Sequence, residues 1–257
     1  GSEMCIRDSY ITEGLYQVDD FNYDASTQTY TLKDGVPYHG DKGQIRPGMW
    51  KFKNLTGDDN VIDENDKTVI GNAQPKFYGG LNNSFTYKGF DLSIFLTFSY
   101  GNEVLNATKL VTSKVGSLNY NALDVMNSSN RWMTINSDGQ KVTDPGELAA
   151  WNAGKTVAAY HDAQQGDNYI HSWAVEDASY LKLSNVTLGY TFPKNLIARV
   201  GLKNLRLYAT GNNLLTWTKY SGFDPEVSTM KSGLTPGVDF GAYPLSRSFI
   251  FGLNVAF

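Results

Sequence analysis

Apolar and polar residues alternate along two neighbouring stretches of the chain, Phe77–Tyr87 and Phe90–Tyr100. In the first stretch the large apolar side chains lie at odd positions, and in the second they lie at even positions. A period of two is that of a β-strand, whose successive side chains point to opposite faces of a sheet. The pattern therefore predicts two strands, each with one apolar face and one mostly polar face.

The two residues between these stretches, Lys88 and Gly89, predict how the strands pair. A two-residue loop with glycine at a position of positive φ is a favoured hairpin connection. Such a loop places Tyr87 opposite Phe90, and directly paired residues project from the same face. The change from odd to even positions then produces one continuous apolar surface, so the predicted register is self-consistent.

Three later stretches show the same alternation: Ser179–Phe192, Lys203–Trp217 and Ser248–Phe257. The first shifts phase near Ser184-Asn185, which indicates a β-bulge, and the second is interrupted at Asn213-Leu214. Strands of about 11 residues, at about 3.3 Å per residue and a tilt of roughly 40°, rise about 28 Å. That height matches the ~25 Å apolar band of an outer-membrane barrel, whereas strands of soluble proteins have about 5–6 residues.

The connections between the predicted strands alternate between short and long. The short ones are the two-residue turn and residues 193–202, and the long ones are residues 101–178 and 218–247, after a polar segment at 10–76. Short periplasmic turns and long extracellular loops are typical of outer-membrane barrels. We therefore predict an all-β fold of antiparallel up-and-down strands that belong to a transmembrane β-barrel with long extracellular loops. In this fragment they should form an open curved sheet whose first and last strands do not pair, and Leu118–Trp132 could form a helix inside the longest loop.

Composition limits the classes of function. A net charge of −4 argues against a nucleic-acid partner, and a single cysteine, Cys5, provides neither a disulfide framework nor a thiolate metal site. No stretch approaches the 18 apolar residues of a membrane helix, and no signal peptide is visible at the start. Residues 2–9 resemble translated sequencing adapter, so we interpret 1–9 as a non-native leader and 10–257 as the barrel portion.

Beyond periodicity, the chain contains a series of stretches in the order typical of one family. They resemble the C-terminal part of SusC/RagA-type TonB-dependent outer-membrane transporters, and together they span nearly everything after residue 10. The stretches are Gly43–Gly48, Asp63–Phe77, Tyr87–Ser93, Asn130–Trp132, Val175–Tyr190, Leu207–Leu215, Thr218–Glu226 and Phe251–Phe257.

The resemblance implies a large transmembrane β-barrel of about 22 strands closed by a plug, and the five predicted strands would be the last five strands of that barrel. It also implies a location in the outer membrane of a Gram-negative bacterium, contact with outer-membrane lipid, and a SusD-like surface lipoprotein as partner. Oligosaccharides or peptides would be imported with energy delivered by TonB, through N-terminal regions outside this chain. The terminal Phe257 resembles the signal that the outer-membrane assembly machinery reads. An enzyme is not expected, and the sequence does not identify the substrate.

One acidic segment, residues 54–66, resembles a degenerate calcium loop. Hard cations prefer clustered oxygen ligands at alternating positions, with glycine at the sharp turn. The candidate ligands are Asp58, Asp63 and Asp66, although Asp59 replaces the glycine. The segment is consistent with a bound Ca²⁺ or with a solvated acidic loop.

Other residue types give weaker signals. The three histidines, His39, His161 and His171, lack ligand spacing and are expected at the surface. The loop tryptophans are expected to pack loops together or to stack on sugar rings; they are Trp50, Trp132, Trp151 and Trp173.

Two alternatives remain at the level of sequence. A passive porin or autotransporter barrel would have the same strands without an upstream plug. A secreted carbohydrate-binding β-sandwich or glycosidase would bury the apolar face between two sheets. The length of the strands and the terminal Phe257 favour the transporter.

Overall fold

The computed structural model describes residues 5–6, 9–57, 59–113, 123–159, 169–226 and 237–257. The chain divides into two compact units. One consists of Gly1–Gly71 and Leu105–Val175, and the other of Asn72–Val104 and Glu176–Phe257. Each unit is described by itself below.

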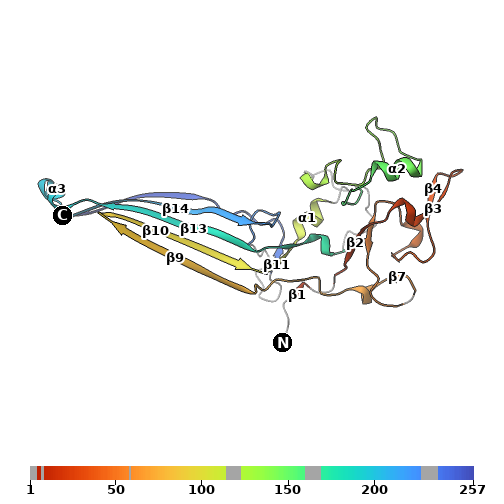
Figure 1. The fold of residues 1–257 in the computed structure, drawn as a ribbon, viewed down its shortest axis with the longest axis horizontal. Helices are drawn as coiled ribbons and strands as arrows, with labels where there is room; N and C mark the ends of the chain where they lie inside the picture. The colour runs from red at the N-terminus through yellow and green to blue at the C-terminus, as the bar shows by residue number, and fades with distance from the viewer. Residues whose placement is uncertain (1–4, 7–8, 58, 114–122, 160–168, 227–236) are drawn as a thin grey trace. The chain divides into compact units, whose positions relative to one another are not determined.

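The second unit is built on a five-stranded antiparallel sheet in which the strands follow one another in chain order (Figure 1). Its strands are β9 (Phe77–Tyr87), β10 (Phe90–Tyr100), β13 (Tyr180–Thr191), β14 (Asn204–Thr218) and β16 (Ser248–Ala256). Within the described residues, β9 and β16 are the two edges and do not pair with each other. The predicted up-and-down strands and the open sheet are confirmed, with boundaries within one residue of those expected.

The hairpin between β9 and β10 has the predicted geometry. Both residues of its loop have positive φ, 45° at Lys88 and 87° at Gly89, which is the combination that a tight two-residue turn requires. The register runs from Tyr87 opposite Phe90 to Phe77 opposite Tyr100 without a shift.

The predicted bulge is also present. Leu183 pairs with Leu215 and Asn185 with Asn212, so Ser184 of β13 lies opposite two residues of β14, Asn213 and Leu214. Asn213 has a φ of 53°, which asparagine tolerates better than most residues. The phase shift in one strand and the interruption in the next are therefore the two sides of a single irregularity.

The connection between β13 and β14 forms a helical turn. It contains α3 (Lys194–Ile197) and the 3-10 helix η6 (Ala198–Val200), followed by Gly201.

Three short strands form a further small sheet in the order β12 (Val175–Asp177), β11 (Glu103–Asn106) and β15 (Val238–Asp239).

The first unit consists of short strands, helical turns and loops. Antiparallel pairs join β2 (Thr12–Leu15) to β6 (Trp50–Phe52) and β3 (Phe21–Asp24) to β4 (Thr29–Leu32). A parallel pair joins β5 (Tyr38–His39) to β7 (Val61–Ile62), and β1 (Cys5–Ile6) pairs with β8 (Gly71–Asn72).

The helices of this unit are short as well: α1 (Ala107–Thr112), α2 (Pro145–Trp151) and the 3-10 helices η1 (Val18–Asp20), η2 (Lys42–Gln44), η3 (Glu64–Asp66), η4 (Asp124–Met126) and η5 (Ser172–Ala174). Helix α2 begins with proline after an N-cap aspartate, Asp144, whose carboxylate accepts the backbone N–H of Glu147 at 2.8 Å. Of the helix predicted at 118–132, residues 118–122 lie outside the described residues, and the described remainder contains the single 3-10 turn η4. In the described part of the chain no helix is long and apolar enough to span a membrane.

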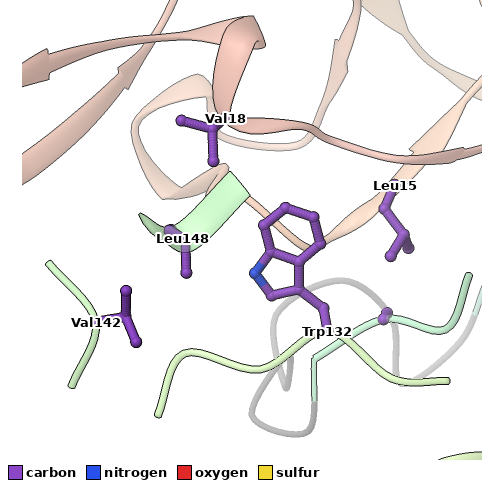
Figure 2. Packing of buried hydrophobic residues seen from close by; sticks show 6 residues of the cluster. Leu15, Val18, Trp132, Val142 and Leu148 are labelled. Atoms are coloured by element: carbon purple, nitrogen blue, oxygen red, sulfur yellow. The ribbon is translucent and has the colours of Figure 1, made fainter. Parts of the chain in front are cut away.

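The core of the first unit includes a cluster around the ring of Trp132, which is 1% exposed. Figure 2 shows this ring with Leu15 on one side and Val18, Leu148 and Val142 on the other. These residues come from four separate segments of the chain. The loops of this unit therefore pack into a body with its own apolar interior.

Candidate functional site

The long-stranded sheet has one face made of large apolar side chains. The register brings them into rows that cross all five strands, such as Phe85, Leu92, Leu188, Ala209 and Phe251. The bulge is essential to this arrangement, because a shift of one residue transfers every following side chain to the other face. With the bulge in place, the two halves of β13 contribute to the same apolar face.

This apolar face is exposed among the described residues. Phe251 is 80% exposed, Phe85 59% and Leu188 50%. Its other exposed members are Phe77, Leu81, Tyr87, Phe90, Tyr100, Leu181, Leu207, Leu215, Trp217, Phe249, Leu253 and Val255. Exposed apolar patches of this extent mark contact with another protein or with a membrane.

The opposite face of the sheet is polar and internally hydrogen-bonded. The amide of Asn185 donates to that of Asn212 at 2.7 Å, and Asn212 donates in turn to the hydroxyl of Ser248 at 3.0 Å. The hydroxyls of Thr187 and Thr210 form a cross-strand hydrogen bond of 2.9 Å. The two faces of one sheet thus require different surroundings.

An ion pair crosses the polar face. The guanidinium of Arg206 on β14 donates from Nε and Nη2 to the two carboxylate oxygens of Asp91 on β10, at 3.0 and 2.5 Å. Gly189 on β13 lies between them, and a Cβ at this position would clash with Nη2 of Arg206 and with the carboxylate of Asp91. The absence of a side chain at Gly189 therefore allows a charge pair to form across an intervening strand.

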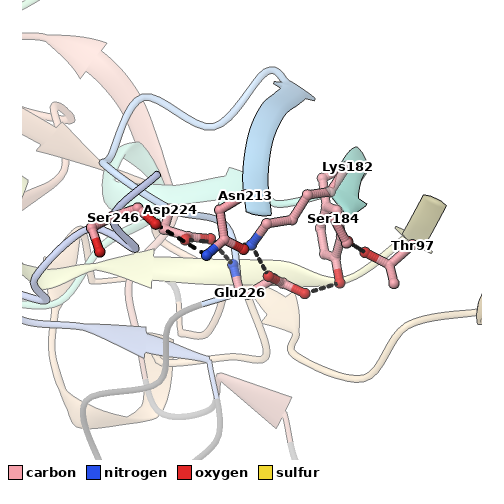
Figure 3. Close-up of polar contacts among 8 residues, drawn as sticks. Thr97, Lys182, Ser184, Asn213, Asp224, Glu226 and Ser246 are labelled. Carbon is pink, nitrogen blue, oxygen red and sulfur yellow. Dashed lines mark hydrogen bonds and ion pairs between the residues drawn. The ribbon is translucent and has the colours of Figure 1, made fainter. Parts of the chain in front are cut away.

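A second charged cluster lies on the polar face where β13 begins. Lys182 is 3% exposed, and its ammonium donates to Glu226 and lies 3.9 Å from the Asp224 carboxylate (Figure 3). The hydroxyl of Tyr180 donates to the other oxygen of Glu226 at 2.6 Å. Burial acts to raise the pKa of Glu226, but the bonds from Lys182 and Tyr180 hold that pKa below its ordinary value. The cluster ties the segment after β14 to the sheet.

The sequence reasoning missed this cluster, although a signal for it was present. Lys182 lies between Leu181 and Leu183 inside a strand pattern, and a lysine that becomes buried requires an acidic partner. Glu226 lies in the stretch Thr218–Glu226 that already resembled the transporter family. The sequence does not show how the segment after β14 folds back to bring Glu226 to Lys182.

The structure describes two of the three predicted cation ligands. Asp58 lies outside the described residues, and Asp63 and Asp66 flank and end the helical turn η3. Oδ1 of the buried Asp66 accepts the backbone N–H groups of Leu55 and Thr56 at 2.6 and 2.8 Å, and Oδ2 accepts that of Asp63 at 2.8 Å. Burial acts to raise the pKa of Asp66, but these backbone hydrogen bonds lower it overall.

Asp66 therefore fixes the conformation of its own loop. Among the described residues, no group of three or more His, Cys, Asp and Glu side chains is arranged to hold a metal ion. The calcium site in the 54–66 loop stays a prediction.

The expectation of surface histidines is wrong for two of the three, and His161 lies outside the described residues. His39 and His171 are each 4% exposed and contact the ring of Phe52, at centroid distances of 5.0 and 5.4 Å. Burial lowers the pKa of His39 to about 4, and burial with the nearby Lys109 lowers that of His171 to about 3. Both rings lie in segments that long-range pairing buries, which local spacing does not reveal.

Some of the loop tryptophans pack against other side chains, and one of them is exposed. Trp132 is enclosed in the core, which leaves its ring no surface for a ligand. Trp50 packs against His171 and Trp173 at centroid distances of 5.0 and 5.1 Å. Trp151 is 42% exposed, and the ammonium of Lys155 lies 5.3 Å from its ring centroid.

One open cavity of about 520 Å³ lies within the first unit, and its volume is in the range of small-molecule sites. Its lining is mixed in charge, with Glu13, Asp19 and Asp20 near Lys51 and Lys155. Lys51 and Asp20 already form an ion pair of 3.0 Å.

No family model matches the chain. Curated relatives do match it. A TonB-dependent receptor of Formosa agariphila is 34% identical over 220 residues, which is 84% of this chain and 20% of the relative. A second TonB-dependent receptor of that organism is 29% identical over 97% of this chain and 23% of the relative. The TonB-dependent receptor SusC of Bacteroides thetaiotaomicron is 29% identical over 85% of this chain and 18% of its own length.

Solved structures match the fold. The RagAB peptide importer in its open-open state covers 97% of this chain with a TM-score of 0.60 and 22% identity, and the match spans 22% of that chain. A structure of the RagAB peptide transporter covers the same share, also with a TM-score of 0.60 and with 21% identity. The likeness includes the open sheet, which is consistent with a segment of a transporter barrel.

The relatives and the fold agree with the family that the sequence motifs resembled, and the chain spans about a fifth of the length of the curated relatives that it matches. Over most of its length the chain is homologous to TonB-dependent receptors, SusC among them.

Proposed function

We propose that the five-stranded sheet is part of the wall of an outer-membrane β-barrel that imports nutrients. The apolar face would contact outer-membrane lipid, and the polar face would line the interior. The observation behind this proposal is the opposite character of the two faces: exposed apolar rows on one side and a hydrogen-bonded polar lattice on the other.

The length of the strands supports the same assignment. β9 and β10 have 11 residues each, enough at about 3.3 Å per residue and a tilt of roughly 40° to cross the ~25 Å apolar band of an outer membrane. Within a bilayer the backbone must be hydrogen-bonded internally, which a closed barrel achieves. The two open edges, β9 and β16, would then pair with further strands of the complete protein.

The cargo and partners of the whole protein belong to the proposal as well. A relative named SusC and the fold of the RagAB peptide importer support import of oligosaccharides or peptides with a SusD-like lipoprotein. Energy would come from TonB, through regions outside this chain. The first unit would form extracellular loops, and the exposed terminal Phe257 would be recognised by the assembly machinery.

The test uses the full-length parent protein, tagged and expressed in a Gram-negative host. We expect it in the outer-membrane fraction, with heat-modifiable gel mobility and with a surface lipoprotein that co-purifies. Uptake of labelled oligosaccharides or peptides should be lost when the segment that contacts TonB is deleted, while assembly is unchanged. Uptake that persists without that segment would indicate a passive porin, and a secreted, detergent-independent monomer would indicate a β-sandwich.

A further inference from the structure

The end of the sheet that holds the Lys88-Gly89 hairpin also holds the connection 193–203 between β13 and β14. The two are adjacent, because the carbonyl of Gly89 accepts the backbone N–H of Thr191 at 2.7 Å. The connection is also bound to the last strand, since the N–H of Lys203 donates to the carbonyl of Ala256 at 2.8 Å. Figure 1 shows α3 beyond the ends of β13 and β14, at this same end.

Positive charge is in excess here, because four cations lie at the end of the sheet where the terminal carboxylate of Phe257 follows Ala256. Lys88, Lys194, Arg199 and Lys203 are all exposed, and none of them forms an ion pair with a carboxylate of the described residues. Residues 192–223 contain no Asp or Glu at all. Asp91, which lies near this end of β10, already forms an ion pair with Arg206.

The same connection exposes apolar side chains beside its cations. Leu196 is 56% exposed and Val200 72%, whereas Ile197 between them is 3% exposed and fixes the helical turn to the protein. A segment with cations and protruding aliphatic side chains is typical of the boundary between lipid headgroups and acyl chains.

Aromatic rings lie in the last rows of the apolar face at this end. Phe90 and Tyr190 are 4.5 Å apart between ring centroids, and Tyr190 and Phe192 are 4.9 Å apart. Aromatic residues of membrane proteins concentrate at the level of the headgroups. If the apolar face contacts lipid, the connection 193–203 lies directly beyond that level.

We infer that this end of the sheet is a docking surface for anionic phospholipid headgroups, here called the basic end and defined by Lys88, Lys194, Arg199 and Lys203 with Leu196 and Val200. The four cations contact lipid phosphates, and the two aliphatic side chains insert among the upper methylenes of the acyl chains. Charge complementarity selects this occupant, because phosphate-bearing lipids supply the negative charge that the sequence around the basic end lacks. The inference rests on the proposed membrane location.

The experiment measures lipid retention by the full-length parent in detergent, by native mass spectrometry. The probes are dioleoyl phosphatidylglycerol and, at the same concentration, dioleoyl phosphatidylcholine. We expect the unmodified protein to prefer phosphatidylglycerol, and the preference to decrease with salt. Each cation near a phosphate contributes about a fivefold factor, so Lys194→Gln with Arg199→Gln should weaken phosphatidylglycerol binding about 25-fold.

A matched control replaces Lys76 and Lys219 by Gln, which removes two exposed lysines at the opposite end of the same strands. That variant should retain phosphatidylglycerol like the unmodified protein. The inference is overturned if the two double variants lose binding equally, or if the unmodified protein does not distinguish the two lipids at any salt concentration. If the unmodified protein still forms a heat-modifiable barrel in the outer membrane, either of these results leaves the proposed function intact. If the unmodified protein does not enter the membrane, the proposed function itself is contradicted.

Discussion

Replacing Ile94 by arginine tests the assignment of the apolar face most directly. Ile94 lies near the middle of β10, between Asn83 of β9 and Val186 of β13, on the apolar face. An arginine that faces lipid at the midplane of a barrel costs about 2–4 kcal/mol. Because every 1.4 kcal/mol is a factor of ten, the ratio of folded to unfolded protein should fall about 30- to 700-fold.

The neighbouring residue provides the control. Ser93 lies at nearly the same depth on the polar face, opposite Ser84 and Thr187, and its hydroxyl donates to Asn82 at 3.2 Å. Ser93→Arg loses that hydrogen bond, about 0.5–1.5 kcal/mol, but places its charge in a polar environment. The two variants add the same side chain one residue apart, so a difference between them reports the surroundings of each face.

The assay is reversible folding of the full-length parent into lipid vesicles, followed by the heat-modifiable band across a urea series. Ile94→Arg should shift the unfolding midpoint to much lower urea, and Ser93→Arg should shift it little. Equal shifts for the two variants, or a larger shift for Ser93→Arg, would refute the assignment of the apolar face to lipid.

Three further results are expected. Lys182→Met leaves the buried carboxylate of Asp224 and the more exposed carboxylate of Glu226 without their cation, so the full-length protein should lose up to about 3–5 kcal/mol of unfolding free energy in the same urea assay. The double variant with Glu226→Gln should recover part of that loss, and an unchanged midpoint would contradict the cluster. The pKa of His39 is about 4 in the fold and about 6.5 when unfolded, so its contribution to the free energy of unfolding is complete above about pH 6.5 and is lost as the pH falls toward 4, by up to about 3 kcal/mol. Hydrogen-exchange protection factors around His39, which are corrected for the pH dependence of the intrinsic exchange rate, should fall over that range and should not fall in His39→Phe. If the 54–66 loop binds Ca²⁺, calorimetric titration of the full-length protein with this ion should release heat, and the Asp63→Asn variant should release none. Absence of heat at millimolar Ca²⁺ would mean that the segment is a solvated acidic loop.

The local pattern of the strands was sufficient to predict the sheet. In β9 and β10 most side chains follow the two-residue alternation, with Tyr78, Asn83 and Phe95 as exceptions, and the Lys88-Gly89 loop predicts the register that the structure has. The bulge at Ser184 was also predictable, because a phase shift in one strand must be matched by an irregularity in its neighbour. The residues concerned are close in sequence or are related by a simple pairing rule.

The buried clusters were not predictable in this way. Lys182 and Glu226 are separated by 44 residues, and the burial of His39 depends on rings contributed by Phe52 and Tyr169. Strand alternation is a property of neighbouring residues, and therefore the sequence by itself determined the strands, the register of the β9–β10 hairpin and the apolar face. Burial and charge pairing between distant residues depend on the paths of the loops in space, and only the tertiary structure decided them.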